Sequence, residues 1–248
     1  MRIALIIFLL ISNGFCGIVD NLFLKGNEAM IAEEYADAIQ AYESILELGY
    51  DNSDLYYNLG NAYYRLHFIG QSIWAYTKAL EMTPRDKDID YNLSVANARI
   101  IDRIEMPDTF ILLYAYRSIK SYLTIYEWFL FGSALLLIQA LWFLSLQFGL
   151  LQGKVPKVIS TSLISLVMMT HIIGMDSYFQ KQRSNTAVVI ANGVDAYSGP
   201  FYGNNSILFQ VNEGSIAEIS NNQKDWVEII LIDGKKGWVP SESIRTIK

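Results

Sequence analysis

Three hydrophobic patterns follow one another along the chain. Over residues 18–106, apolar residues recur at spacings of three and four, which predicts amphipathic helices. Two uncharged apolar runs follow, Trp128–Leu151 and Val158–Met175, each long enough to cross a membrane as a helix. After Ser184 come short runs rich in β-branched and aromatic residues, separated by glycine and asparagine, which predict strands. The sequence therefore predicts a multidomain membrane protein with an all-α part, a transmembrane helical hairpin and a C-terminal all-β part.

The helical part repeats itself in a fixed register. The repeat consists of matched small and large positions: Gly26, Ala38, Tyr42 and Ile45 recur as Gly60, Ser72, Tyr76 and Ala79. The matched positions are 34 residues apart. A constant period of 34 residues is typical of paired antiparallel helices that stack on one another. We expect one pair over Val19–Leu48, a second over Ser53–Met82 and a capping helix near Lys87–Ile104. Because this array is short, we expect it to need support from a membrane or a partner.

The second unit resembles the tetratricopeptide repeat family. The matching positions are Tyr56, Leu59, Gly60, Tyr63, Ser72, Tyr76, Ala79 and Pro84. Such repeats are usually binding scaffolds, so the resemblance implies recognition and not chemistry. Helical spacing places one face of each first helix in a concave groove, where asparagine amides can both donate to and accept from a peptide. The expected protein-binding residues are Asn27, Tyr57, Asn58, Asn61, Tyr64, Arg65 and Asn92; the alternative is that the asparagines are merely solvated.

Two pairs of residues lie outside these patterns. Phe68 and Trp74 either form a contact surface or pack against neighbouring helices. His171 and Asp176, near the end of the second apolar run, are either functional ionisable groups or anchors at the membrane interface.

Segment 1–17 has the pattern of a secretory signal peptide: Arg2, an apolar run, then small residues. The alternatives are an uncleaved anchor, or a lipoprotein acylated at Cys16. Export of the helical part would place the protein in the inner membrane of a bacterium, with both soluble domains facing the periplasm. The predicted domains are 1–17 (signal peptide), 18–106 (repeat domain with cap), 107–127 (linker), 128–151 and 158–178 (transmembrane helices), 152–157 (cytoplasmic loop) and 185–248 (all-β domain).

The all-β domain resembles the bacterial SH3-like family. The matching segments are Tyr197–Pro200, Glu213-Gly214, Asp225–Val227 and Gly234–Pro240. The pattern after Ser184 predicts five short strands, which suit a small barrel: Ala187–Ile190, Ile207–Val211, Ser215–Ile219, Trp226–Ile232 and Gly237–Val239. The resemblance implies a domain that binds cell-wall peptides or envelope proteins. Tyr197 and Trp226 are candidates for its ligand surface, although packing in the core explains Trp226 equally well.

The composition limits which partners and which catalytic or metal-binding functions we expect. The apolar fraction is 52%, the formal charge is −6, and the chain holds one cysteine and two histidines. Without clustered basic residues we expect no nucleic-acid partner. No nucleophile–base motif, phosphate-binding loop or His/Cys cluster is visible, so we expect no enzyme activity, no cofactor and no metal.

The order of the parts resembles the E-type membrane proteins of bacterial aerotolerance (Bat) operons. That resemblance implies von Willebrand factor A-type membrane proteins as partners and a role in survival of oxidative stress. Membrane lipid is a further expected contact. The sequence thus favours a non-catalytic membrane-anchored scaffold that presents periplasmic protein-binding modules. The alternative is a sensor or tether that binds peptidoglycan; an envelope enzyme is a third class, for which no catalytic group stands out.

Overall fold

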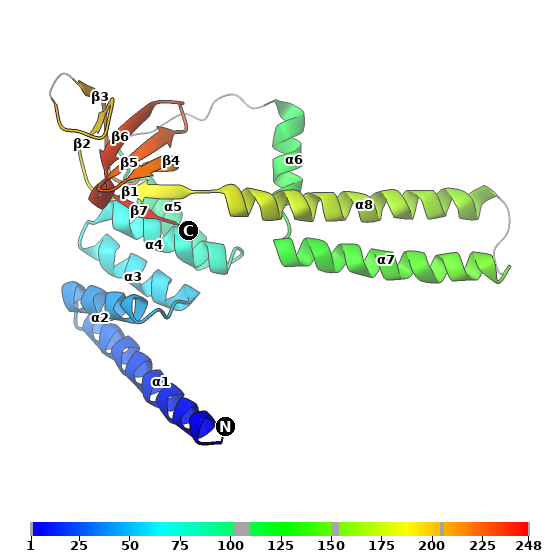
Figure 1. The fold of residues 1–248 in the computed structure, drawn as a ribbon, viewed down its shortest axis with the longest axis horizontal. Coiled ribbons are helices and arrows are strands. Elements are labelled where there is room, and N and C mark those ends of the chain that lie inside the picture. Colours follow the sequence, from blue (N-terminus) through cyan, green and yellow to red (C-terminus); the bar gives the residue numbers. More distant parts are fainter. Residues whose placement is uncertain (1, 102–109, 150–153, 204–205, 248) are drawn as a thin grey trace. The chain divides into compact units, whose positions relative to one another are not determined.

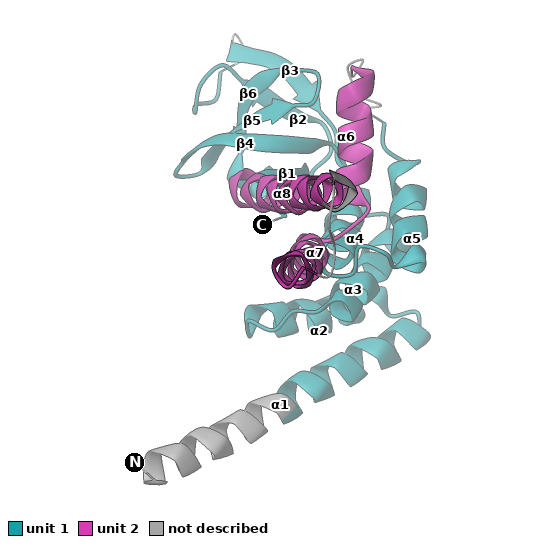
Figure 2. Ribbon diagram, turned by 90° about the vertical axis from the view of Figure 1, so that its right-hand side faces the viewer, with its two compact units in different colours: residues 1–106, 185–248 teal, residues 107–184 magenta. Residues whose placement is uncertain are grey.

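The chain folds into two compact units. The computed structural model describes residues 2–101, 110–149, 154–203 and 206–247, with side chains from residue 17 onward except at 154–156. Unit 1 comprises residues 1–106 and 185–248, and unit 2 comprises residues 107–184 (Figure 2). Both ends of the chain therefore build one unit, and the segment between them builds the other. The side chain of Cys16 and residues 150–153, part of the predicted span end and loop, lie outside the described residues.

Unit 1 begins with a stack of helices (Figure 1). They are α1 (Arg2–Ile31), α2 (Tyr35–Glu47), α3 (Ser53–Arg65), α4 (Ile69–Met82) and α5 (Lys87–Asn97). Side-chain caps fix the starts of α3 and α5. The Asn52 side chain accepts from the Leu55 amide, and the Asp86 side chain accepts from the Ile89 amide. The small residues of the repeat allow the two helices of a pair to approach each other closely. A Cβ on Gly60 of α3 would overlap the ring of Tyr76 in α4. Gly26 and the ring of Tyr42 are related in the same way.

The rest of unit 1 is an antiparallel β-domain. Its strands are β1 (Thr186–Val189), β2 (Val194–Tyr197), β3 (Ile207–Val211), β4 (Ile216–Gln223), β5 (Trp226–Leu231), β6 (Lys236–Pro240) and β7 (Ile244–Thr246). Among the described residues these seven form one sheet in the order β3-β2-β6-β5-β4-β1-β7. The five predicted strands are present. The sequence pattern missed β2 and β7, because both are short and neither shows a clear alternation of buried and exposed residues.

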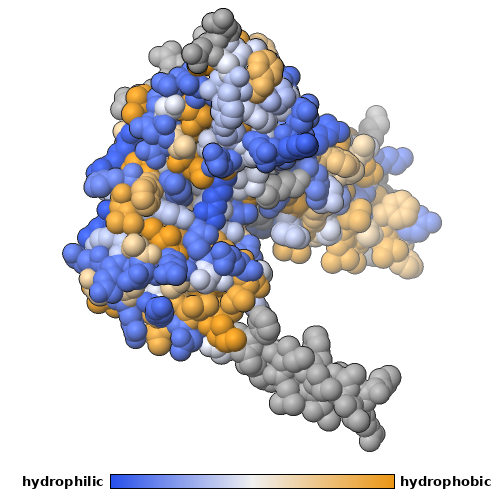
Figure 3. Space-filling model, turned by 60° about the vertical axis from the view of Figure 1, so that its left-hand side comes forward, coloured by the Kyte–Doolittle hydropathy of each residue, from blue (hydrophilic) through white to orange (hydrophobic). Residues whose placement is uncertain are grey.

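Unit 2 consists of α6 (Ile111–Ser121), α7 (Ile125–Gln147) and α8 (Lys154–Arg183). Within the described residues, α7 and most of α8 are long and apolar enough to cross a membrane. A core helix of a soluble protein would be mostly buried, whereas only 11% and 17% of an apolar 18-residue stretch of each helix is buried. Figure 3 shows hydrophobic side chains on the visible face of this hairpin, in contrast to the mixed surface of unit 1.

Small residues also let the two hairpin helices approach each other. A Cβ on Gly132 of α7 would lie 2.6 Å from the His171 ring of α8, so glycine leaves the space that the ring fills. His171 bonds through Nδ1 to the Val167 carbonyl at 2.8 Å, and its ring packs edge-on against Phe129. His171 therefore packs between the two helices. Segment 107–127, predicted as a linker, contains the whole of α6.

The hydrophobic core of the helices extends into the sheet of unit 1, which also has a core of its own. Strand β1 is buried on both faces: Ala187 and Val189 pack inside the β-domain, while Val188 joins the core of the helices together with Ile247. Trp74 of α4 is only 4% exposed. Its indole Nε1 donates to the Thr246 carbonyl at 2.7 Å. Trp74 thus packs against the chain's own β-domain, a neighbour that neither interpretation of its sequence pattern had identified.

Arg245 of β7 ties the sheet to α2, α3 and α4. Its two terminal nitrogens donate to the two carboxylate oxygens of Glu43 at 2.7 and 2.8 Å. Its guanidinium lies 3.6 Å from the centre of the Trp74 ring. Tyr63 of α3 donates to the same carboxylate and accepts from Arg245 at 3.2 Å. A paired charge that stacks on an aromatic face and binds two oxygens at once is a geometrically demanding contact, so it fixes how the sheet sits on the helices.

A second contact fixes the start of α4. Its N-cap residue, Phe68, makes no side-chain cap. The carboxylate of Glu213, from the β-domain, instead accepts from the Gly70 amide at 2.9 Å, and a negative charge at a helix N-terminus is favourable. A Cβ on Gly70 would lie 2.5 Å from the Val189 carbonyl oxygen, so only glycine permits this approach. We call these contacts, made by Glu43, Tyr63, Gly70, Trp74, Val188, Glu213, Arg245 and Ile247, the helix–sheet interface.

Arg245→Ala should destabilise unit 1 by about 2–4 kcal/mol, because it leaves the partly buried Glu43 carboxylate without its cation. The check is denaturant unfolding of the full chain in detergent micelles, followed by tryptophan fluorescence. Lys236→Ala is the matched control, since it breaks the more exposed Lys236–Glu228 pair and should change stability by less than about 0.5 kcal/mol. Equal losses in the two variants would contradict a structural role for Arg245.

The helix–sheet interface should also weaken in acid. Burial raises the pKa of Glu43, but hydrogen bonds from Arg245 and Tyr63 and the charge of Arg245 outweigh it, so the pKa lies below its ordinary 4.5. The stability that this shift contributes is present above pH 4.5 and is lost as the pH falls through the lowered pKa.

We therefore expect unfolding measurements from pH 7 down to pH 3 to show a steeper acid loss for the natural chain than for Glu43→Gln. The variant should be less stable at pH 7 and should approach the natural chain at pH 3. Parallel curves would show that Glu43 does not carry the acid dependence.

Candidate functional site

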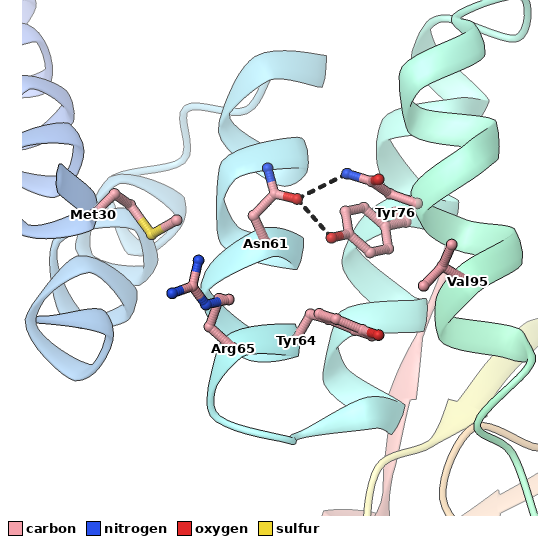
Figure 4. A pocket seen from close by; sticks show the side chains of 7 residues that line it. Met30, Asn61, Tyr64, Arg65, Tyr76 and Val95 are labelled. Carbon is pink, nitrogen blue, oxygen red and sulfur yellow. Dashed lines mark hydrogen bonds between the residues drawn. The ribbon is translucent and has the colours of Figure 1, made fainter. Parts of the chain in front are cut away.

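A pocket of about 330 Å³ opens on the side of the helical stack formed by α1, α3 and α5. It is lined by Met30, Asn61, Tyr64, Arg65, Tyr76, Asn92 and Val95 (Figure 4). Four of the seven predicted groove residues line it: Asn61, Tyr64, Arg65 and Asn92. Of the other three, Tyr57 bonds to the lining residue Asn92, whereas Asn27 and Asn58 do not line the pocket and bond to each other. The pocket is open and mixes polar, aromatic and aliphatic groups.

The asparagines form a hydrogen-bond pattern that follows the sequence repeat. In the first unit, Asn27 Oδ1 accepts from the Tyr42 hydroxyl at 2.7 Å and from Asn58 Nδ2 at 3.3 Å. In the second unit, Asn61 Oδ1 accepts from the Tyr76 hydroxyl at 2.7 Å and from Asn92 Nδ2 at 3.0 Å. Each bond joins residues at the same sequence separations in the two units. These bonds link neighbouring first helices to one another and to the second helix of the pair.

This pattern determines what the asparagines can offer a ligand. The Asn61 oxygen is occupied by Tyr76 and Asn92, and its amide nitrogen points away from them (Figure 4). Among the described residues that nitrogen has no acceptor, so it can donate to a ligand carbonyl. Asn92 Nδ2 is shared between Asn61 and the Tyr57 hydroxyl, the latter at 3.2 Å. The asparagines therefore hold the groove in shape, and Asn61 also offers one donor to its contents.

Burial raises the pKa of Tyr42 from its ordinary 10.0 to about 12, and it also raises the pKa of Tyr76. Tyrosine is protonated at neutral pH even without such a shift, so both hydroxyls donate there, and the raised pKa extends this to more alkaline solutions.

Arginines supply positive charge at the pocket. Arg65 lies 4.5 Å from the Tyr35 ring centre and 3.7 Å from the Glu33 carboxylate. Arg99 lies 4.9 Å from the ring centre of Tyr64, which lines the pocket. The Arg65 side chain is 53% exposed, so it can turn toward a ligand at little energetic cost. The pocket can therefore bind an extended peptide through the Asn61 amide and attract a peptide carboxylate.

The prediction missed the apolar lining. Met30 occupies the position in the first unit that Tyr64 occupies in the second, and Val95 is the equivalent of Asn61 in the capping helix. The repeat register thus pointed to both positions, but a rule that selected polar and aromatic types excluded them. Tyr76 was assigned to the core, where its ring does lie, while its hydroxyl reaches the pocket.

Three aromatic rings cluster on the β-domain. Tyr197 and Trp226, the two predicted ligand residues, have ring centres 5.5 Å apart, edge to face. Tyr202 lies 4.7 Å from Trp226 and 5.7 Å from Tyr197. Tyr202 is 70% exposed, whereas the other two are half-buried. The cluster presents aromatic faces and edges to solvent, which suit proline rings, sugar rings or peptide planes.

Residues 191–246 match the family model for bacterial SH3 domains. The predicted SH3-like domain is therefore confirmed over this segment, which we call the SH3 domain below. A comparison with curated proteins finds no significant match for the chain. A bacterial SH3 domain is consistent with binding of proteins or peptidoglycan, and the three-ring cluster lies within the matched residues.

The repeated hydrogen bond should have the same strength in both units. Tyr76→Phe and Tyr42→Phe each remove one buried hydroxyl donor, and each should lower the free energy of unfolding by about 1 kcal/mol. Denaturant unfolding of the full chain in micelles measures both. Tyr50→Phe, on a partly exposed tyrosine after α2, is the control and should have no effect. Loss in one unit without the other would contradict an equivalent role.

Proposed function

We propose that this protein is a non-catalytic, membrane-anchored binding scaffold. In this proposal α1–α5 form a short array of tetratricopeptide type, α7 and α8 cross the bacterial inner membrane as a hairpin, and the SH3 domain completes the soluble part. The groove beside Asn61 and the three-ring cluster are its two binding surfaces.

The observation that carries the proposal is the helix–sheet interface. It joins residues before the hairpin, such as Trp74, to residues after it, such as Arg245. Two segments can pack together in this way only when both lie on the same side of a membrane. The chain between them must then cross an even number of times, and a two-helix hairpin meets this condition. An exported N-terminal segment puts that shared side in the periplasm, with the 152–157 loop in the cytoplasm.

The two surfaces suit different ligand chemistry. The Asn61 amide and the neighbouring arginines favour an extended, acidic or carboxylate-bearing peptide segment of an envelope protein. The aromatic cluster favours flat, weakly polar ligands, among them cell-wall peptides and glycans. The finer proposal, from the order of the parts, is that the envelope partners are von Willebrand factor A-type membrane proteins and that the assembly supports survival of oxidative stress.

The peptidoglycan tether is the second candidate function, and the exposed Tyr202 ring is the observation that favours it. In this version the SH3 domain holds the cell wall while the helical groove holds a protein. The two versions differ in what the aromatic cluster binds, so they predict different behaviour of the same variants.

Two single variants of the full chain test the proposal, by crosslinking in native membranes and by retention of the micelle-purified chain on peptidoglycan. Arg65→Ala should reduce several-fold the amount of envelope protein crosslinked to the chain in native membranes, because it removes the exposed cation at the groove. Tyr202→Ala should reduce retention on purified peptidoglycan if the chain is a tether, and should reduce protein crosslinking if the SH3 domain binds protein. Tyr50→Ala, outside both surfaces, is the control. Unchanged binding of every partner in both variants would overturn the scaffold proposal.

A further inference from the structure

Helix α6 (Ile111–Ser121) is fastened across one end of the hairpin. In Figures 1 and 2 it runs across the direction of α7 and α8 and not along it. The Tyr116 hydroxyl donates to the Asp176 carboxylate of α8 at 2.6 Å. Lys120 donates to the same carboxylate and, at 2.6 Å, to Gln180. These contacts give Asp176, a residue whose role the sequence left open, a structural partner in α6.

The same end of α6 is tied to α7. The Trp128 indole donates to the Lys120 carbonyl at 3.1 Å. Helix α7 begins directly after α6, where Thr124 and Glu127 form a capping box. Helix α6 is therefore held at the end of the hairpin where the chain enters and leaves it.

The side of α6 next to its α8 contact carries exposed apolar residues. Successive helical residues are about 100° apart, which places Ile111, Leu112, Ile119 and Tyr122 on one face beside that of Tyr116 and Lys120. These four are 73%, 68%, 49% and 81% exposed. Arg117 lies opposite the centre of this face, with Leu113, Tyr114 and Ser121 on the same far side, while Ser118 borders Ile111. An apolar face with a cation opposite it is a pattern of helices that lie in a membrane surface.

The surroundings of α6 match the boundary of a bilayer. Tyr122, Tyr126 and Tyr178 lie in or near the helix ends at this side of the hairpin, and tyrosine is enriched at the level of the lipid headgroups. Lys181 and Arg183 occupy the last turn of α8, where cations meet lipid phosphates. The apolar face of α6 thus continues the exposed apolar surface of α7 and α8 at the depth where that surface ends.

We propose that α6 lies in the headgroup boundary of the membrane, with Ile111, Leu112, Ile119 and Tyr122 among the upper acyl chains and Arg117 directed to lipid phosphates. The occupant of this helix face is lipid, and the expected depth of the apolar residues is about 5–10 Å below the headgroups. In this position α6 limits the depth to which the hairpin of α7 and α8 inserts into the bilayer. This inference rests on the proposed membrane anchor.

The test measures the surroundings of single labelled cysteines in the full chain. Cys16, the one natural cysteine, is replaced by serine. An environment-sensitive fluorophore is attached at Leu112→Cys on the apolar face, or at the exposed Ser121→Cys on the far side of the helix as the matched control. Leu137→Cys, within α7, reports on the anchor itself. Each protein is placed in nanodiscs of phosphatidylcholine and phosphatidylglycerol, which leave both membrane surfaces open to reagents, and is exposed to aqueous dithionite or to nitroxide-bearing lipids.

At position 112 we expect dithionite reduction several-fold slower than at position 121, together with strong quenching by nitroxides near the headgroup end of the acyl chain. Equal, rapid reduction at 112 and 121 while 137 stays protected would overturn the placement of α6 and leave the anchor intact. Protection at 112 without quenching by lipid nitroxides would show that protein covers this face, which also overturns it. Rapid reduction at 137 would remove the membrane anchor and, with it, this inference.

Discussion

The contact between Arg245, Glu43 and Trp74 is the constraint on which the rest of unit 1 depends. It joins β7 to α2 and α4 across most of the length of the chain. Around it, Val188 and Ile247 complete the hydrophobic core of the helices, so the sheet takes the place of the further helices that a longer array would supply. The short helical stack therefore finds the support it needs within its own chain, in addition to any that a membrane or partner supplies.

This constraint connects structure to topology and to binding. A unit built from both ends of the chain leaves the middle segment as an insertion, so any membrane crossing there must return to its starting side. The same packing holds the pocket beside Asn61 and the aromatic cluster around Trp226 in one body. If both proposed surfaces bind ligands, their fixed arrangement allows them to act on one partner or to hold two partners together. The effective concentration is then higher than a long flexible linker would give.

Local sequence patterns predicted most of the helices and strands, but they could not predict contacts between residues far apart in the sequence. The repeat register anticipated the helix pairs, and it reappears in the hydrogen bonds of Asn27 and Asn61. The uncharged runs predicted α7 and α8, although α7 begins at Ile125, where Thr124 caps it. The turn and tryptophan at Gly237-Trp238 pointed to the SH3 domain. In contrast, Trp74 meets Thr246 at a separation of 172 residues, and no periodicity encodes such a pairing.

Helix α6 was missed for a different reason. The segment 107–127 was predicted only as a linker, and the amphipathic helix within it is 11 residues long, much shorter than the apolar runs that predicted α7 and α8. The candidate site was predicted in part, because groove positions follow from helical spacing. What spacing could not show is that the asparagine oxygens are occupied by Tyr42 and Tyr76, since that depends on the distance between neighbouring helices.

The most direct test is crosslinking between positions 98 and 218, which precede and follow the hairpin in the sequence and line one pocket of unit 1. In native membranes, the full chain would carry Cys16→Ser, Ala98→Cys and Glu218→Cys, which leave the Arg245–Glu43 pair in place, and would be treated with a short bifunctional maleimide. If the two ends of the chain form one unit on one side of the membrane, the two cysteines should be joined within a single chain and shift its mobility on a denaturing gel. Reaction of each cysteine with a single-ended maleimide, but no link between them, would contradict the common unit and the topology that depends on it.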